Sequence, residues 1–337
     1  MLVGSHALYS VTDAGVAELA NATGLGPVGR KPLEVRVLSP ALFLAVLLLA
    51  ASARASGEGG WGVATPLPVA RTEVAAARLG SEIVLLGGFL ADGTSTGRVD
   101  AYSPLTGRWR RLPDLPAKVN HAMAAAFAGR LYVVGGYGAE RRAFVYFGAR
   151  WRALRNLPAP RAAAGAAIVN EKLYIVGGVL APGKLAQRML IFDLRRSRWS
   201  FAPGPSPREH LAVTAAGGLV YALAGRSGGT NFTTFESYLP KRRAWRRLPP
   251  VPYPRGGTGA AVLRGRIVSV GGEEPAGTIA SVYAYRIATR RWARLPDMRT
   301  PRHGLGVAAF GDRVYAIGGG PQPGLHVSAA NEFLTLP

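Results

Sequence analysis

A paired small-residue step, in most copies Gly-Gly, recurs six times in this chain, each time 25 or 26 residues after a tryptophan. The pairs are Gly87-Gly88, Gly135-Gly136, Gly177-Gly178, Ala224-Gly225, Gly271-Gly272 and Gly318-Gly319. The tryptophans are Trp61, Trp109, Trp151, Trp199, Trp245 and Trp292, which lie 42 to 48 residues apart and are all the tryptophans of the chain. A period of this length indicates an array of one supersecondary unit.

The first unit shows what is repeated. Residues 83–86 are a short apolar run that ends at the Gly pair, which is typical of a buried strand. A Gly-, Ser- and Thr-rich loop follows, and residues 99–102 and 108–112 then alternate on either side of a turn, which predicts a hairpin. A Pro-rich corner leads to the Ala-rich stretch 121–126 of the next unit. Each unit therefore predicts four short strands, a to d in chain order.

The residue types suit sheets packed radially around an axis. Strand a is rich in Ala and Gly, as expected where sheets crowd together, and strand b is rich in Val, Ile, Leu and Tyr. The Gly pair allows backbone torsions and a close approach that a side chain would forbid. The Trp of outer strand d is placed to cover the gap between neighbouring sheets.

With this repeat the chain resembles the kelch family of β-propellers, in the form of a secreted bacterial-type kelch protein. The resemblance rests on the Gly pair after strand b, the Trp of strand d, and an aromatic residue in strand c, which precedes that Trp by seven residues in four units and by five in the second. These aromatic residues are Tyr102, Tyr146, Phe192, Tyr238 and Tyr285. The resemblance implies an all-β, six-bladed propeller. Residues around Trp61 are expected to supply strand d of the last blade, whose strand c is expected at residues 331–334, so that the ring closes without a covalent link.

Residues 1–55 are expected to be a leader, and residues 56–337 the propeller. Arg30, Lys31 and Arg36 precede an apolar stretch at about 41–53, and small residues at 51–55 follow in the A-x-A pattern of a signal-peptidase site. This pattern predicts secretion or another extracytoplasmic location in the cell envelope, with a retained anchor as the alternative. Because the segment before Arg30 is long for a signal peptide, translation beginning downstream, near Val35 or Val37, is a further expectation.

The chain carries a formal net charge of +22, and much of it flanks the tryptophans of the outer strands. One interpretation is attachment to an anionic surface through this basic periphery, since clustered charge attracts anionic partners. The other is a solvated edge whose Lys and Arg residues prevent pairing between exposed strands. Nucleic acid is not expected as a partner because no nucleic-acid-binding motif accompanies the charge. A membrane is expected to be contacted only through the leader or this basic surface.

An arginine stands 16 residues before the small-residue pair in five of the six units, at the start of strand a. These are Arg71, Arg161, Arg208, Arg255 and Arg302, and in the second unit Lys118 is displaced by one position. We expect them to ring the mouth of the channel, since guanidinium groups pair well with carboxylates and phosphates. In kelch proteins that bind acidic peptides, arginines at this position contact the ligand, so the resemblance implies an acidic protein segment or anionic glycan as partner. The alternative is structural, with each Arg bonding loop carbonyls of the neighbouring blade. Loop residues expected to join the site are Phe89, Tyr137, Glu140, Arg226, Asn231, Glu273 and Glu274.

The sequence gives weaker indications of metal binding and of catalysis. His121, His210 and His303 lie near these arginines, but they come from alternate blades without a ligand spacing, so neither a metal site nor a cofactor is expected. The chain has no Cys, which excludes the Tyr–Cys cofactor of the copper oxidases among kelch-type propellers. An enzymatic alternative is a sugar mutarotase acting on a sialic acid, with Arg208 as carboxylate clamp and Glu209 and His210 as proton carriers. We expect a monomeric binding protein.

Overall fold

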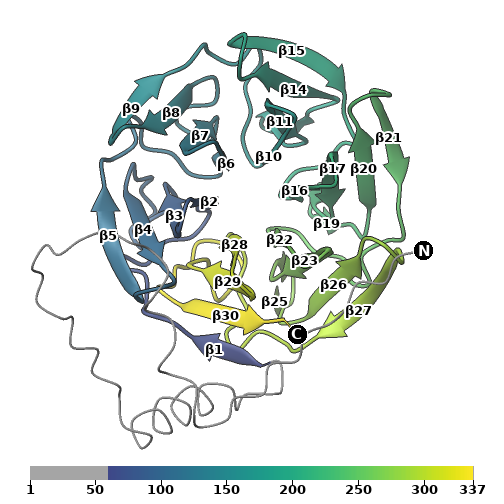
Figure 1. Cartoon of the computed structure of the whole chain (residues 1–337). Helices are drawn as coiled ribbons and strands as arrows, with labels where there is room; N and C mark the ends of the chain where they lie inside the picture. Colours follow the sequence, from purple (N-terminus) through teal and green to yellow (C-terminus); the bar gives the residue numbers. More distant parts are fainter. Residues whose placement is uncertain (1–59, 337) are drawn as a thin grey trace, which may run out of the picture. The chain divides into compact units, whose positions relative to one another are not determined.

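The computed structural model describes residues 60–336, which contain thirty strands and no helix. Twenty-four of these strands form six four-stranded antiparallel sheets, and the sheets stand around a central axis as the blades of a ring (Figure 1). The prediction of an all-β, six-bladed propeller is therefore confirmed.

Each blade is built from four strands in the order a to d from the axis outward. The first three blades are β2 (Ala75–Leu79), β3 (Glu82–Leu86), β4 (Val99–Ser103) and β5 (Arg108–Leu112); β6 (Met123–Phe127), β7 (Arg130–Val134), β8 (Ala143–Phe147) and β9 (Arg150–Ala153); and β10 (Gly165–Val169), β11 (Lys172–Val176), β14 (Arg188–Asp193) and β15 (Arg198–Pro203). The next two are β16 (Ala212–Ala216), β17 (Leu219–Leu223), β20 (Phe235–Leu239) and β21 (Ala244–Arg247); and β22 (Gly259–Leu263), β23 (Arg266–Val270), β26 (Val282–Arg286) and β27 (Arg291–Leu295).

Three of the loops between strands b and c carry a short hairpin of their own. These hairpins are β12 (Val179–Ala181) with β13 (Lys184–Leu185), β18 (Arg226–Ser227) with β19 (Thr230–Asn231), and β24 (Glu273–Glu274) with β25 (Gly277–Thr278).

The sixth blade closes the ring as predicted. It consists of β28 (Gly306–Phe310), β29 (Arg313–Ile317), β30 (Asn331–Thr335) and, on its outer edge, β1 (Trp61–Val63). Trp61 lies opposite Leu334 and Val63 opposite Glu332 in an antiparallel register. Strand d of this blade thus comes from the other end of the propeller sequence, and backbone hydrogen bonds join the two ends.

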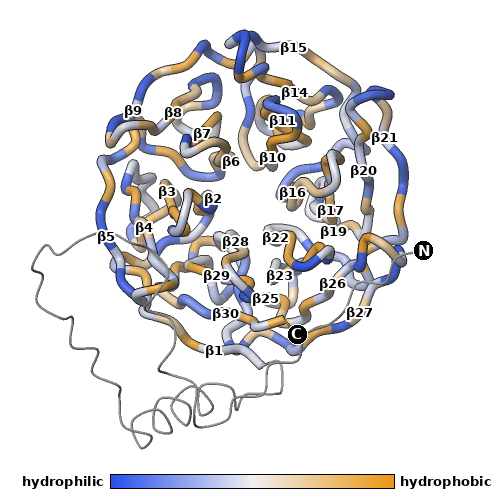
Figure 2. The backbone as a smooth tube through the Cα atoms, in the orientation of Figure 1, coloured by the Kyte–Doolittle hydropathy of each residue, from blue (hydrophilic) through white to orange (hydrophobic). Residues whose placement is uncertain are grey.

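The apolar core lies between neighbouring blades. The second strand of each blade is almost wholly buried, and its side chains join clusters that span two blades, such as the one shared by Val84 of β3 and Leu131 of β7. Figure 2 shows hydrophobic segments within the blades and many hydrophilic segments around the perimeter. The first strands line a channel of about 460 Å³ with small residues. A Cβ added at Gly259, for example, would meet the side chain of Val307 in the next blade, so the Ala- and Gly-rich sequence of strand a is a steric requirement.

The Gly pair joins each blade to the next one. The N–H of its second residue donates to the backbone carbonyl at the start of strand a in the following blade, at the position that is Arg in five blades. The six bonds are Gly88–Val119, Gly136–Arg161, Gly178–Arg208, Gly225–Arg255, Gly272–Arg302 and Gly319–Arg71, each 2.8 or 2.9 Å. Both residues of every pair have positive φ, which an L side chain rarely adopts. A Cβ at Gly87 would also lie 2.7 Å from the Val119 carbonyl oxygen, so the motif serves close backbone contact.

Each tryptophan joins its blade to the preceding one at the periphery, as predicted. Its indole N–H donates to a backbone carbonyl at or just after the end of the outer strand of that blade. The bonds are Trp61–Pro296, Trp109–Thr65, Trp151–Pro113, Trp199–Arg155, Trp245–Pro203 and Trp292–Pro249, each 2.8 or 2.9 Å. Five of these rings also pack on the strand c aromatic, as Trp199 does on Phe192 with ring centroids 4.7 Å apart. The repeat period of the sequence therefore corresponds to two blade-to-blade bonds, one near the axis and one at the rim.

The predicted leader, its apolar stretch and the boundary at residue 55 lie outside the described residues. Within residues 60–336 no helix meets the length and apolarity needed to cross a membrane.

The closing strand offers a direct test of ring closure. A Cβ at Gly62 would lie 2.7 Å from Cε2 of Phe333 on β30, so Gly62→Val is expected to lower the free energy of unfolding by about 1–3 kcal/mol through overpacking. The measurement is urea unfolding followed by tryptophan fluorescence. Combining Gly62→Val with Phe333→Ala should cost less than the sum of the two single variants, because the ring that clashes is gone. Additive losses would contradict the pairing of β1 with β30.

Candidate functional site at the channel mouth

The five arginines at the start of strand a do not ring the mouth of the channel, and this prediction is corrected by the structure. The side chains of Arg71, Arg161, Arg208, Arg255 and Arg302 have exposed fractions of 0 to 1%. Their guanidinium groups do not point into the channel. Each points into its own blade and donates there to backbone carbonyls. Arg302, for example, donates to the carbonyls of Gly318 and Ala316 at 2.8 and 2.9 Å.

Three of these arginines also pair with a buried carboxylate on strand c of the same blade. Arg71 Nη2 lies 2.6 Å from Asp100 Oδ2, Arg208 Nη1 lies 2.6 Å from Glu236 Oε2, and Arg302 Nη1 lies 3.0 Å from Glu332 Oε2. Arg161 and Arg255 have no ion pair within residues 60–336 and are held by backbone carbonyls, with Ser281 Oγ in addition for Arg255.

Burial lowers the pKa of Arg71, Arg161 and Arg255 to about 10, so all three stay charged at neutral pH. The contacts of all five arginines fit the structural interpretation, with the difference that each bonds its own blade and not the neighbouring one.

The second blade differs from the other five at this position. Val119 occupies the position of the arginines, since its carbonyl accepts the bond from Gly88 N and its side chain is buried. Lys118, one residue earlier, is exposed on the mouth face, and its backbone carbonyl packs against Gly138. Lys118 is thus the one predicted ligand-binding cation of the six whose side chain faces solvent.

The residues that do face the axis stand two positions after the arginines. They are Glu73, His121, Ala163, His210, Gly257 and Gly304, and all six have φ between +50° and +65°. The N–H of each residue from the second to the sixth donates to the carbonyl of the equivalent residue in the preceding blade, and Val74 N closes the circle onto Gly304 O. This left-handed turn directs the side chains of Glu73, His121 and His210 to the centre of the channel.

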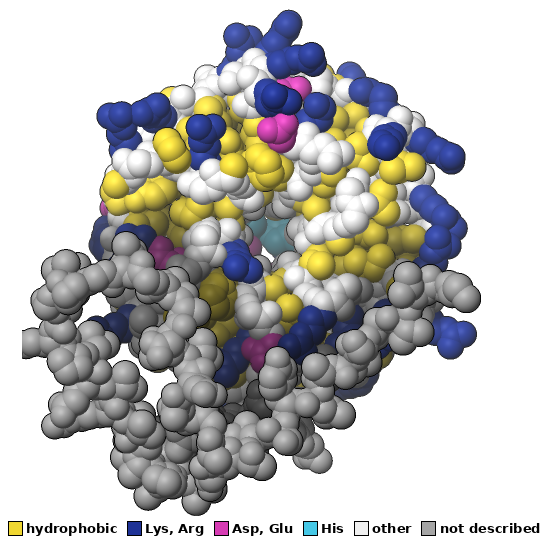
Figure 3. All heavy atoms as spheres, viewed as in Figure 1, with side chains coloured by type: hydrophobic (Ala, Val, Ile, Leu, Met, Phe, Trp, Pro, Cys, Tyr) yellow, Lys and Arg dark blue, Asp and Glu magenta, His cyan; other side chains and the backbone are white. Residues whose placement is uncertain are grey.

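These three side chains meet across the axis. His121 Nε2 lies 2.9 Å from His210 Nε2 and 3.1 Å from Glu73 Oε2. His121 Nδ1 lies 2.5 Å from Asn120 Oδ1, and His210 Nδ1 lies 2.9 Å from Glu209 Oε2. In the space-filling view a histidine is visible in the central channel (Figure 3).

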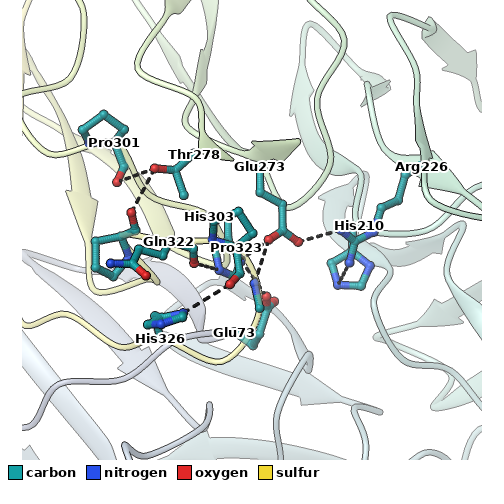
Figure 4. Close-up of polar contacts among 12 residues, drawn as sticks. Glu73, His210, Arg226, Glu273, Thr278, Pro301, His303, Gln322, Pro323 and His326 are labelled. Atoms are coloured by element: carbon teal, nitrogen blue, oxygen red, sulfur yellow. Dashed lines mark hydrogen bonds and ion pairs between the residues drawn. The ribbon is translucent and has the colours of Figure 1, made fainter. Parts of the chain in front are cut away.

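Charged residues from the fourth, fifth and sixth blades surround the cluster. Arg226 bonds both Glu209 and Glu273, at 3.2 and 2.6 Å, and its Nη2 lies 3.3 Å from His210 Nε2. His303 Nδ1 lies 3.1 Å from Glu73 Oε1 and 3.5 Å from Glu273 Oε2. In Figure 4, Glu73 and Glu273 both approach His303, and Glu273 also extends toward Arg226.

The close contacts shift the ionisation of these groups. Burial lowers the pKa of His121 to about 4, with Glu73 opposing this shift and His210 adding to it. Burial alone would raise the pKa of Glu73, but its contacts with His121 and His303 outweigh burial and hold that pKa well below its usual value. Burial would lower the pKa of His303, yet the hydrogen bond to Glu73 and the charges of Glu73 and Glu273 raise it. The mouth therefore contains an ionised Glu73 beside a neutral His121.

Most residues of this cluster were expected near the mouth, but their contact with one another was not predicted. Arg226, Glu273, Phe89 and Tyr137 were expected at the site and line a cavity of about 320 Å³ with the histidines. His303 stands one position before Gly304, the residue equivalent to His121 and His210, so its side chain leaves the strand in another direction. His303 still joins the cluster, through Glu73. Glu73 itself was missed, although its position two residues after Arg71 matches that of His210 after Arg208.

A second depression adjoins this cavity at Tyr137, beside the second blade. Only six residues connect Gly136 to β8, against nine to eleven in the other blades, so no hairpin stands there. The space left is a groove of about 640 Å³, walled by residues 137–142 on one side and by residues 160, 162 and 179–182 on the other.

Comparison with known proteins agrees with this geometry. A model described as the KLHDC2/KLHL20/DRC7 Kelch-repeats domain matches residues 149–319, and a Kelch motif model matches residues 70–116. The chain belongs to the kelch-repeat family.

Among curated kelch proteins, the chain is 30% identical over 184 residues to the Kelch-like protein terF of Aspergillus terreus, covering 47% of this chain and 40% of that one. It is 34% identical over 76 residues to an F-box/kelch-repeat protein of Arabidopsis thaliana, covering 23% of this chain and 20% of that one. It is 27% identical over 150 residues to Kelch-like protein 35 of Mus musculus, covering 44% and 26%. The kelch chain thus spans less than half the length of each of these relatives.

The structural role of the buried arginines can be tested by comparing two of them. Arg302→Met leaves the Glu332 carboxylate buried without its cation and is expected to lower the free energy of unfolding by about 3–5 kcal/mol. Arg161→Met removes bonds to backbone carbonyls alone and should cost about 1–3 kcal/mol. Urea unfolding measures both. Adding Glu332→Gln to Arg302→Met should recover part of the loss, and equal effects of the two single variants would contradict this assignment.

Proposed function

We propose that this kelch protein is a protein-interaction propeller, and that it binds an acidic segment of a partner protein in the groove beside the second blade. The observation that carries the proposal is the combination of apolar walls and exposed cations in a groove that a shortened loop leaves open. The mouth of the propeller thus remains the proposed binding face, although the arginines first expected to form it are buried.

The walls of the groove suit apolar side chains of a bound peptide. Tyr137 and Ala139 face Val179, Leu180 and Pro182 across it. Recognition sites of this kind are mostly apolar with a few polar groups that fix the orientation of the ligand. Apart from Tyr137, these apolar wall residues are aliphatic or proline and offer few hydrogen bonds to a sugar, which favours a peptide over an anionic glycan as the ligand.

The rim of the groove supplies positive charge. Lys118, Arg141, Arg142 and Lys184 are exposed around it, and none of them has an ion pair within residues 60–336. The carboxylate of Glu140 accepts a hydrogen bond from the backbone N–H of Gly138 at 3.1 Å. Such an excess of cations attracts an acidic segment and speeds its association.

A second candidate function is attachment to an anionic surface. Lys and Arg side chains project from the perimeter of the ring along the top and both sides of the view in Figure 3. Those of β21, Arg246 and Arg247, are exposed and have no ion pair within the described residues. Attachment of this kind is screened by salt.

The sugar mutarotase is a weaker candidate because Arg208, its proposed carboxylate clamp, is buried against Glu236. Glu209 and His210 do lie at the mouth, but Glu209 is paired with Arg226. An extracytoplasmic location remains a proposal, which rests on the leader sequence alone. N-terminal sequencing of the protein recovered from the cell envelope or the medium tests it.

The charge-reversed variant Lys118→Glu/Arg141→Glu tests the groove. We expect it to weaken binding to peptides selected from an acidic peptide array by at least about tenfold, because two attractive rim charges become repulsive. Binding is measured by fluorescence anisotropy with the full chain. The matched control, Arg246→Glu/Arg247→Glu on the outer strand, should leave the affinity within about twofold.

The opposite result would favour surface attachment. If the groove variant binds all selected peptides normally, or if the array yields none, the groove proposal fails. If Arg246→Glu/Arg247→Glu then loses salt-sensitive binding to vesicles containing phosphatidylglycerol, the basic perimeter is the binding surface.

A further inference from the structure

We propose that Glu73, His121 and His210 form a binding site for one divalent transition-metal ion at the centre of the channel, and that zinc fits the site best. The site uses one side chain from each of the first, second and fourth blades. It lies beside the groove described above and goes beyond the function proposed for it.

The three ligand atoms already stand close to metal-binding separations. His121 Nε2 is 2.9 Å from His210 Nε2 and 3.1 Å from Glu73 Oε2, and the ligand atoms of all three residues lie within 4.8 Å of one another. Zinc bonds of about 2.0–2.2 Å in a tetrahedral arrangement place ligand atoms roughly 3.3 Å apart. Outward movements of a few tenths of an ångström would therefore admit the ion.

The groups beside the two Nδ1 atoms, a hydrogen-bonded amide oxygen for His121 and a nearby carboxylate for His210, favour a free electron pair on both Nε2 atoms. Asn120 Nδ2 donates to Ser95 Oγ, so the amide oxygen faces His121 and must accept the proton of His121 Nδ1. His210 Nδ1 faces the carboxylate of Glu209 at 2.9 Å, in a contact that is short but imperfectly aligned for a hydrogen bond. The partner of one ring nitrogen determines which nitrogen is free. Two imidazole lone pairs and a carboxylate oxygen thus converge on one point, where a cation would join them.

Asn120 and Glu209 are also the outer partners that metal-binding histidines use. A ligating His almost always donates its second ring N–H to a carboxylate, carbonyl or amide oxygen, which orients the ring and raises its basicity. Both histidines here have such a partner on the adjacent residue of the chain. The left-handed backbone at His121 and His210 sets the direction in which each side chain leaves the main chain. The two rings are therefore positioned before any ion binds.

The local charge favours a divalent cation although the protein as a whole is strongly basic. Glu209 and Glu273 pair with Arg226, and Glu73 contacts His303, so Glu73, Glu209, Glu273 and Arg226 together carry a formal charge of minus two. One negative charge remains even with His303 protonated. Arg226 Nη2 lies 3.3 Å from His210 Nε2, but two carboxylates hold and neutralise this guanidinium.

The ligand set also indicates which ions fit. Imidazole suits Zn²⁺, Cu²⁺, Ni²⁺ and Fe²⁺, whereas Mg²⁺ and Ca²⁺ prefer oxygen ligands alone. Three protein ligands leave one coordination position open. That position adjoins the cavity lined by Phe89 and Tyr137, so water or a carboxylate would complete the coordination there.

The direct test uses the full chain purified without a polyhistidine tag and freed of metal by dialysis against a chelator. Titration with Co²⁺ is expected to produce the visible d–d absorption of a tetrahedral site, saturating at one ion per chain, and Zn²⁺ should displace the Co²⁺ stoichiometrically. Mg²⁺ should displace none. Absence of a saturable Co²⁺ spectrum, and of Zn²⁺ binding by calorimetry, would overturn the proposal without any variant being needed.

Variants then assign the ligands. His121→Gln and His210→Gln are each expected to weaken Zn²⁺ affinity at least about 100-fold, and Glu209→Gln about tenfold, as an outer partner does. His326→Gln is the matched control, because the His326 side chain is exposed and bonds only the Pro323 carbonyl within the described residues. Unchanged circular dichroism would show that each variant is folded. Equal losses in His326→Gln and His210→Gln would place the metal elsewhere and refute the site.

Discussion

The hydrogen bond from the second residue of each Gly pair to the first carbonyl of the next blade is the contact on which the rest of the structure depends. It requires two consecutive residues with positive φ and, at the second of them, a backbone contact that leaves no room for a side chain. Six such bonds fix how closely the blades approach, and hence how small the residues of strand a must be. The indole bonds of the six tryptophans then hold the same blades together at the rim.

The same blade-to-blade geometry creates the mouth. Because strand a starts at a fixed point in every blade, its first turn repeats six times around the axis and links into a circle of backbone hydrogen bonds. Where that turn carries Glu73, His121 or His210, the backbone conformation directs the side chain into the channel. The second blade, with its shorter loop, breaks the symmetry of this face and leaves the groove open at one side.

The architecture could be predicted because the chain is a repeat. The period stays recognisable even where one copy departs from the pattern. The site could not be predicted equally well. Arg71, Arg208 and Arg302 carry a charge that suggests a ligand, yet each faces a carboxylate on strand c of its own blade, a pairing that lies 28 to 30 residues away in the sequence. The histidines of blades two and four seemed too far apart to meet. Their approach depends on the width of the channel, which no spacing in one chain reveals.

The sequence by itself determined the number of blades, the order of their strands and the closure by the segment around Trp61, since periodic spacing and residue size are local properties of the chain. The tertiary structure alone decided which polar groups are buried and which meet. The direction of a side chain at the start of strand a depends on one residue with a left-handed backbone conformation and on the contacts with the neighbouring blade. A shift of two positions, from Arg208 to His210, separates a buried structural cation from a ring that faces the axis.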